Sequence, residues 1–205
     1  MARIAIVALV GVVALLGIAQ FAVPPLAEKR VEDRLTEGGG SADASVDAPF
    51  PAALLLTGSG DAIEVRGSGL DIEIDSDDSP VFDRLDGFDR VDVDLRDFHA
   101  GPFDVDSFEL TRDGSGPYAL RSSSTTTGAA LVAYGAGRLG VPGASLIPLI
   151  TGAGSAGDEP LPVELDMELE SDDGRITVTS GGGTVAGYPT GPLAELLTQA
   201  IVVRL

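Results

Sequence analysis

The sequence predicts an α+β protein in which an antiparallel β-sheet, built as a meander, packs against one or two helices behind an N-terminal membrane or signal helix. Three observations support this prediction. Apolar and acidic residues alternate with a period of two in several segments, segments with helical periodicity are few and short, and the chain opens with a long uncharged stretch. Because 205 residues fit one domain after such a stretch, we expect an export or anchor segment over 1–25 and a single domain over 26–205.

The composition excludes several classes of function. The chain carries 32 acidic and 13 basic side chains, a net charge of −19, and this charge repels the phosphate backbone of nucleic acids. The absence of cysteine excludes disulfides and thiolate chemistry. His99 is the only histidine, which excludes zinc sites with several histidine ligands. We therefore expect no metal, no cofactor and no nucleic-acid partner, and a hydrophobic content of 44% is enough for a small core.

The N-terminus reads as a membrane or export signal. Residues 4–19 are all apolar, and Arg3 with the free amine supplies a short positive region before them. As a helix, residues 4–23 would extend about 30 Å, enough to span a bilayer. The small residues Gly17 and Ala19 also suit cleavage before Gln20. Cleavage and retention both stay open, and both place the domain in the cell envelope on the extracytoplasmic side, membrane-anchored or secreted.

The remaining elements follow in order. Ala27, Val31 and Leu35 recur every four residues and predict a helix over 26–37, which the glycines at 38–40 end. Alternating segments, separated by turn residues such as those at 113–114 and 173–174, predict a series of strands. These strands cover 44–48, 63–65, 70–75, 91–95, 103–111, 118–123, 163–170 and 175–180, and further helical segments are expected over 51–56, 128–139 and 193–199.

Strict alternation predicts a sheet with one wet, acidic face and one apolar face that other elements must cover. Between residues 128 and 157 the only charged residue is Arg138, and glycine and proline are frequent. Such a segment forms either a flexible cover of the core or the wall of an apolar cavity. It is the strongest indication of a hydrophobic ligand that composition alone provides.

Three segments in succession carry a family resemblance. A helix ending Val31-Glu-Asp-Arg-Leu35 precedes Val46-Asp-Ala-Pro-Phe50-Pro-Ala-Ala-Leu-Leu-Leu-Thr-Gly58, and Ile63-Glu-Val-Arg-Gly-Ser-Gly-Leu70 follows. This order resembles the actinobacterial LmeA-like family of cell-envelope phospholipid-binding proteins over about residues 26–124. The resemblance implies a curved antiparallel sheet curled around a helix, akin to tubular lipid-binding domains, with a hydrophobic groove and no catalytic residues.

The predicted function is therefore non-enzymatic binding of phospholipid acyl chains, with the membrane contacted through the N-terminal segment. The groove candidates combine three residues of the family motif with four apolar residues of the long uncharged stretch: Phe50, Leu54, Leu55, Leu131, Tyr134, Leu149 and Ile150. The alternative is a membrane-anchored structural or interaction module with a filled core and a protein partner in the envelope. A hydrolase is a more distant alternative, because the chain has no Trp and only three Tyr to stack against sugars.

Three further motifs have simpler explanations. Gly135-x-Gly137-x-x-Gly140 lacks the long helix that a dinucleotide site needs, and Val141-Pro142 follows it, so it predicts a glycine-rich turn. The acidic run over 71–78 places alternate carboxylates about 6.6 Å apart on a strand, which favours a solvated face over a calcium site. His99 beside Asp97 could form an acid–base pair, but neighbours in a strand face opposite sides.

Overall fold

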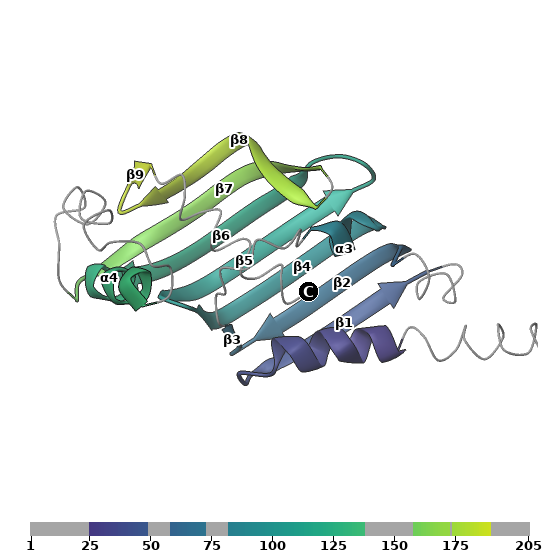
Figure 1. Ribbon diagram of the computed structural model, residues 1–205, viewed down its shortest axis with the longest axis horizontal. Coiled ribbons are helices and arrows are strands. Elements are labelled where there is room, and N and C mark those ends of the chain that lie inside the picture. Colours follow the sequence, from purple (N-terminus) through teal and green to yellow (C-terminus); the bar gives the residue numbers. More distant parts are fainter. Residues whose placement is uncertain (1–24, 49–57, 73–81, 138–157, 173, 190–205) are drawn as a thin grey trace, which may run out of the picture.

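A computed structural model describes residues 25–48, 58–72, 82–137, 158–172 and 174–189. Nine strands form one open, mixed sheet with few helices, so the fold is α+β and mostly β (Figure 1). The strands are β1 (Ser41–Asp47), β2 (Gly60–Ser68), β3 (Asp71–Ile72), β4 (Phe88–Ala100), β5 (Phe103–Asp113), β6 (Tyr118–Thr127), β7 (Pro160–Asp172), β8 (Arg175–Val185) and β9 (Tyr188–Pro189). Their order across the sheet is β1-β2-β4-β5-β6-β7-β8-β9, and β3 pairs with β4 off this path.

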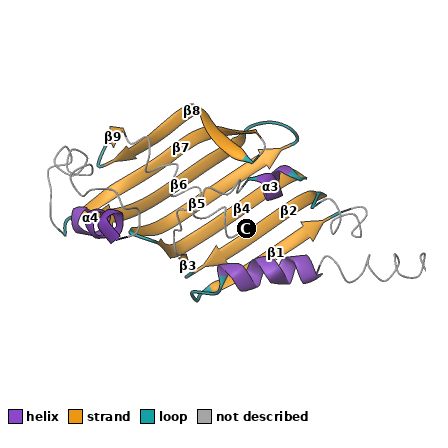
Figure 2. Ribbon diagram, viewed as in Figure 1, coloured by secondary structure: helices purple, strands orange, loops and turns teal. Residues whose placement is uncertain are grey.

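Three helical segments accompany the sheet in the described residues (Figure 2). A helix over 25–35 lies along β1, α3 (Asp83–Asp86) precedes β4, and α4 (Gly128–Gly137) follows β6 directly. Thr127 starts α4, because its hydroxyl accepts a hydrogen bond from the Ala130 N–H at 3.0 Å. The predicted helices over 26–37 and 128–139 are thus confirmed to within two residues at each end.

The predicted purely antiparallel meander is wrong at one place. From β4 to β9 every neighbouring pair is antiparallel, but β2 and β3 both run parallel to β4. β2 and β3 pair with successive parts of β4, and the pairing is interrupted at Gly69. Gly69 has a φ of +65°, and Asp97, beside it on β4, has a φ of +48°. The Gly69 N–H donates to the Asp97 carbonyl at 3.0 Å, so the two irregularities fit together.

The alternation in the sequence sorts the side chains as predicted. On β4, Val91, Val93 and Leu95 are buried while the acidic residues between them face outward. The same pattern runs through β1, β2, β5 and β7, and the apolar face carries the core together with Val31 and Leu35 of the helix over 25–35. Burial of apolar surface at about 25 cal/mol per Å² therefore holds this helix and the sheet together.

Several predicted elements lie outside the described residues. These are the N-terminal segment over 1–24, the helical segments over 51–56 and 193–199, and the strand predicted over 70–75 beyond Ile72. In the part of the chain that is described, no helix is both long and apolar enough to cross a membrane.

Candidate functional site

A cavity of about 400 Å³ lies where the helix over 25–35 meets the sheet and α3. Its volume falls within the range of about 300–1,000 Å³ that ligand pockets occupy. The lining combines six apolar side chains, three arginines, one aspartate and one glycine: Ala27, Val31, Val46, Ile63, Leu85, Phe88, Arg30, Arg34, Arg84, Asp83 and Gly58. The apolar members from Val31 to Phe88 are each at most 8% exposed, so they form a buried apolar floor.

The arginines give the lining of this cavity a positive charge, opposite to the net charge of the whole protein. Arg30 and Arg84 are exposed, Arg34 is half-buried, and Asp83 is the only carboxylate among the described residues of the lining. The chain as a whole has a net charge of −19. An apolar floor beside guanidinium groups suits a ligand with an apolar body and an anionic end, because guanidinium binds carboxylate and phosphate groups in a planar, two-point geometry.

Helical spacing explains how one helix supplies both kinds of side chain. Ala27, Arg30, Val31 and Arg34 occupy positions i, i+3, i+4 and i+7, and such positions share one face of a helix. The neighbouring face is fixed to β1 by Glu28 and Glu32. This anchoring holds the cavity-lining face toward α3.

A second cavity, of about 610 Å³, lies on the other side of α3 and is mainly polar. At its wall Asp86 accepts hydrogen bonds from the Tyr118 hydroxyl at 2.8 Å, the Ser171 hydroxyl at 2.6 Å and Arg112 Nη1 at 3.1 Å. Arg112 Nη2 also donates to the carbonyls of Leu85, Asp86 and Phe88, and so caps the end of α3. Most of these groups pair with one another and fix α3, but among the described residues the buried Nε of Arg112 has no hydrogen-bond partner.

Tyr118 is the best buried member of this cluster. The residue is 1% exposed, and its ring stands edge-on to Phe82 with centroids 4.9 Å apart and lies under the Arg112 guanidinium at 4.6 Å. Burial, with a contribution from the hydrogen bond to the Asp86 carboxylate, raises the pKa of the Tyr118 hydroxyl far above its usual value of 10.0. The hydroxyl therefore stays a hydrogen-bond donor.

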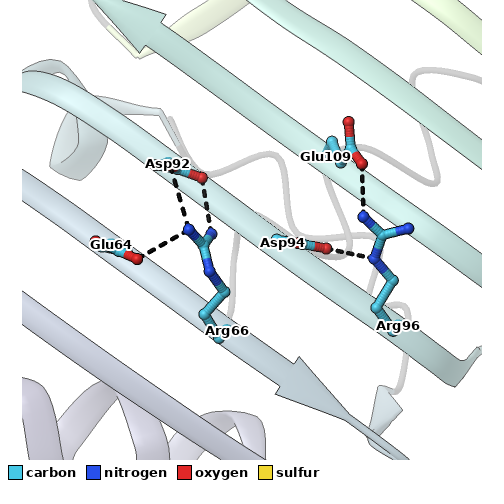
Figure 3. Close-up of polar contacts among 6 residues, drawn as sticks. All are labelled: Glu64, Arg66, Asp92, Asp94, Arg96 and Glu109. Atoms are coloured by element: carbon cyan, nitrogen blue, oxygen red, sulfur yellow. Dashed lines mark hydrogen bonds and ion pairs between the residues drawn. The ribbon is translucent and has the colours of Figure 1, made fainter.

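The outward face of the sheet carries ion pairs that span three strands (Figure 3). Arg66 on β2 contacts Glu64 at 2.8 Å and Asp92 on β4 at 2.9 Å. Arg96 on β4 contacts Asp94 and Glu109, the latter on β5, both at 2.6 Å. The hydrogen bond to Asp92 raises the pKa of Arg66, and the one to Asp94 raises that of Arg96, so both side chains stay cationic. These side chains are 30–54% exposed, and such pairs contribute little each.

His99 does not pair with Asp97. Its Nδ1 lies 2.5 Å from Asp104 Oδ1, because β4 and β5 place the two residues opposite each other in register. Both side chains are more than two-thirds exposed and line neither cavity described above. Within the described ranges no group of three or more potential metal ligands comes together.

The predicted groove residues fall into two groups. Leu131 and Tyr134 lie on α4, where Leu131 is 3% exposed in the core and Tyr134 packs half-buried against it. Neither lines the two cavities above. The other predicted residues, Phe50, Leu54, Leu55, Leu149 and Ile150, lie outside the described residues. A groove lined by these seven residues stays a prediction.

Sequence reasoning missed the arginines of the apolar cavity. The signal for Arg30 and Arg34 was present, since both follow Ala27 at helical spacing on the predicted helix. No signal existed for Arg84, because it reaches the cavity only through the position of the short α3.

Comparisons with protein-family models, with curated proteins and with solved structures found no match to this chain. They identify no family for it, so the resemblance to LmeA-like proteins rests on the quoted sequence segments alone.

Proposed function

We propose that this protein is a non-enzymatic lipid-binding protein of the cell envelope that holds an acyl chain in the cavity between the helix over 25–35 and the sheet. The observation that carries the proposal is the combination of a buried apolar floor with an arginine rim in one cavity of about 400 Å³. Each methylene buried on such a floor contributes about 0.8 kcal/mol. Arg30 and Arg84 would orient the anionic end of the lipid toward solvent.

Chain continuity supports a position next to the membrane. The uncharged segment over 4–23 ends two residues before the helix that supplies Ala27, the first cavity residue. If this segment is retained in a bilayer, the cavity-lining helix begins at the membrane surface. The finer architecture in the proposal is a sheet curved around its helices, as the LmeA-like resemblance implies.

The direct test is native mass spectrometry with lipid extraction on the full chain, produced with export in a bacterial host. We expect wild-type protein to carry an anionic phospholipid and to exchange it with vesicles of phosphatidylglycerol. The variant R30E/R84E should lose most of this lipid. R90E/R175E changes the charge equally at exposed sites outside the cavity and should keep it.

A second pair of variants tests the apolar floor without touching a charge. Ala27→Phe fills the cavity, whereas Ala133→Phe adds the same ring at an exposed position of α4. We expect only the first to reduce bound lipid. Wild-type protein that carries no lipid and takes none from vesicles would overturn the proposal and favour the anchored interaction module with a protein partner.

A further inference from the structure

The two exposed arginines of the apolar cavity keep their charge available to a ligand. Within the described residues, neither Arg30 nor Arg84 forms an ion pair or a side-chain hydrogen bond. Four arginines of the sheet, in contrast, each pair with a carboxylate: Arg66, Arg96, Arg112 and Arg121. The guanidinium groups of Arg30 and Arg84 can therefore bind an anion without first breaking a contact of their own.

The volume of the cavity limits the apolar part of that ligand. A methylene group takes up about as much space as a water molecule, about 30 Å³, so a cavity of about 400 Å³ holds roughly a dozen methylenes. This is enough for most of one acyl chain. The two chains of a membrane phospholipid need at least twice that space.

Two cavities that share residues with the apolar one have charged walls. The described lining of the polar cavity beyond α3 contains five charged residues: Asp83, Asp86, Asp89, Arg112 and Glu170. The described lining of a third cavity, beside the helix over 25–35, also contains five: Lys29, Arg30, Asp33, Arg34 and Glu37. An acyl chain in either would take water from charged groups and give them no hydrogen bond in return. A second chain is therefore not accommodated beside the first.

We propose that the apolar cavity is selective for single-chain anionic lipids, which are fatty acids and monoacyl phospholipids. The chain lies on the buried floor, and the anion lies at Arg30 and Arg84. A diacyl lipid can insert one chain, but the methylenes of its other chain stay at the protein surface in water, and this weakens its binding. The proposal rests on the proposed function, because it names the class of lipid that the same cavity would hold.

The test uses the full chain held in an amphipathic polymer, because a detergent would itself be a single-chain competitor. The protein is mixed with equal amounts of monomyristoyl and dimyristoyl phosphatidylglycerol, and bound lipid is quantified by mass spectrometry after gel filtration. We expect the monoacyl lipid to be in at least about tenfold excess. Ala27→Phe fills the cavity and should abolish this excess, whereas Ala133→Phe, at an exposed position of α4, should keep it.

A series of chain lengths measures the cavity from inside. For monoacyl phosphatidylglycerols of eight to eighteen carbons, each added methylene should tighten binding about fourfold until the cavity is full. Beyond about fourteen carbons the gain per methylene should fall below about twofold, because the volume is used up. Myristate and monomyristoyl phosphatidylglycerol share the same chemistry, and the tighter of the two identifies the source of the natural ligand.

A neutral ligand tests the two arginines. Monomyristoylglycerol should bind at least about fivefold more weakly than monomyristoyl phosphatidylglycerol, because it has no anion. R30Q/R84Q should remove this difference. R90Q/R175Q changes the charge equally at exposed sites outside the cavity and should keep it.

The outcomes separate this proposal from the proposed function. Equal binding of the monoacyl and diacyl lipids, or affinity that keeps rising steeply to eighteen carbons, would overturn single-chain selectivity and leave lipid binding in place. An excess of monoacyl lipid that survives Ala27→Phe would also overturn it, because that lipid would lie elsewhere. Wild-type protein that binds neither lipid would overturn both proposals.

Discussion

Glu32 closes the outer edge of β1 by accepting a hydrogen bond from the backbone N–H of Ala44, 3.2 Å away. Glu28, one helical turn earlier, does the same for Val46. A helix carboxylate thus takes the place of a neighbouring strand, and it also adds negative charge where another chain would approach. The helix over 25–35 uses two faces. Its apolar and arginine side chains line the cavity, and its glutamates accept hydrogen bonds from the edge strand β1.

The first prediction follows from this contact. E28A/E32A should leave the β1 edge open and produce association that grows with protein concentration, measured by analytical ultracentrifugation. D33A/D43A removes the same charge from the helix and β1 without touching an edge hydrogen bond, so this control should associate no more than wild type does. Equal association of both variants would point to charge and not to the edge.

The second prediction concerns the anchor of α3. Asp86→Ala removes the acceptor of Tyr118, Arg112 and Ser171 and leaves a nearly buried guanidinium without a carboxylate. We expect a loss of about 3 kcal/mol in the free energy of unfolding, measured with urea. Asp83→Ala, at an exposed position of the same helix, should cost less than about 0.5 kcal/mol.

The third prediction is an alkaline loss of stability. The folded pKa of Tyr118 lies above the value of 10.0 expected when unfolded, so its contribution is complete below pH 10 and falls as pH rises beyond it. The slope for one such group is at most about 1.4 kcal/mol per pH unit. Urea unfolding of wild type should approach this slope between pH 10 and 11, and Tyr118→Phe should show a shallower one there. Parallel slopes would contradict it.

The fourth prediction concerns salt. Because the net charge is −19, the melting temperature should rise with sodium chloride as repulsion is screened. Arg96→Gln frees Asp94 and Glu109 from their common partner, so its melting temperature should be lower at low salt and rise more steeply. Arg175→Gln changes the same charge at an exposed site and should follow wild type more closely.

The fifth prediction uses two glycines with positive φ. A Cβ at Gly40, where φ is +84°, would come within 2.5 Å of the Gly69 carbonyl group, whereas a Cβ at Gly114, where φ is +63°, meets nothing within 4 Å. Gly114→Ala should cost about 1 kcal/mol through its backbone alone. Gly40→Ala should cost about 2 kcal/mol more, because the backbone around Gly69 must shift. Equal losses in thermal unfolding would contradict the steric argument.

Much of the sheet was predictable because its alternation is local. Val91, Val93 and Leu95 carry the period of β4 in their own sequence, and no distant contact is needed to recognise it. The direction of β2 relative to β4 was not predictable in the same way. It depends on where the chain returns after β3, and periodicity contains no information about that path.

The candidate site was less accessible to sequence reasoning. An apolar ligand site was expected from the composition over 128–157, whereas the described cavity draws on Val46, Leu85 and the helix arginines. Leu131, a predicted groove residue, packs in the core instead of lining that cavity. Apolar periodicity identifies which side chains leave water, but it does not distinguish a filled interior from a hollow one.

The parallel pairing of β2 with β4 has a consequence for the order of folding. Within β4–β6, and again within β7–β9, consecutive strands pair antiparallel across a short turn, so each pair can form locally. β2 can pair with β4 only after β4 has formed, and this pairing closes residues 69–87 into a loop, which costs chain entropy. We therefore expect the β4–β6 hairpins to form early and the β1–β2 hairpin, with the helix over 25–35, to dock last. The cavity would then be completed only in the final step of folding, when its two halves first meet.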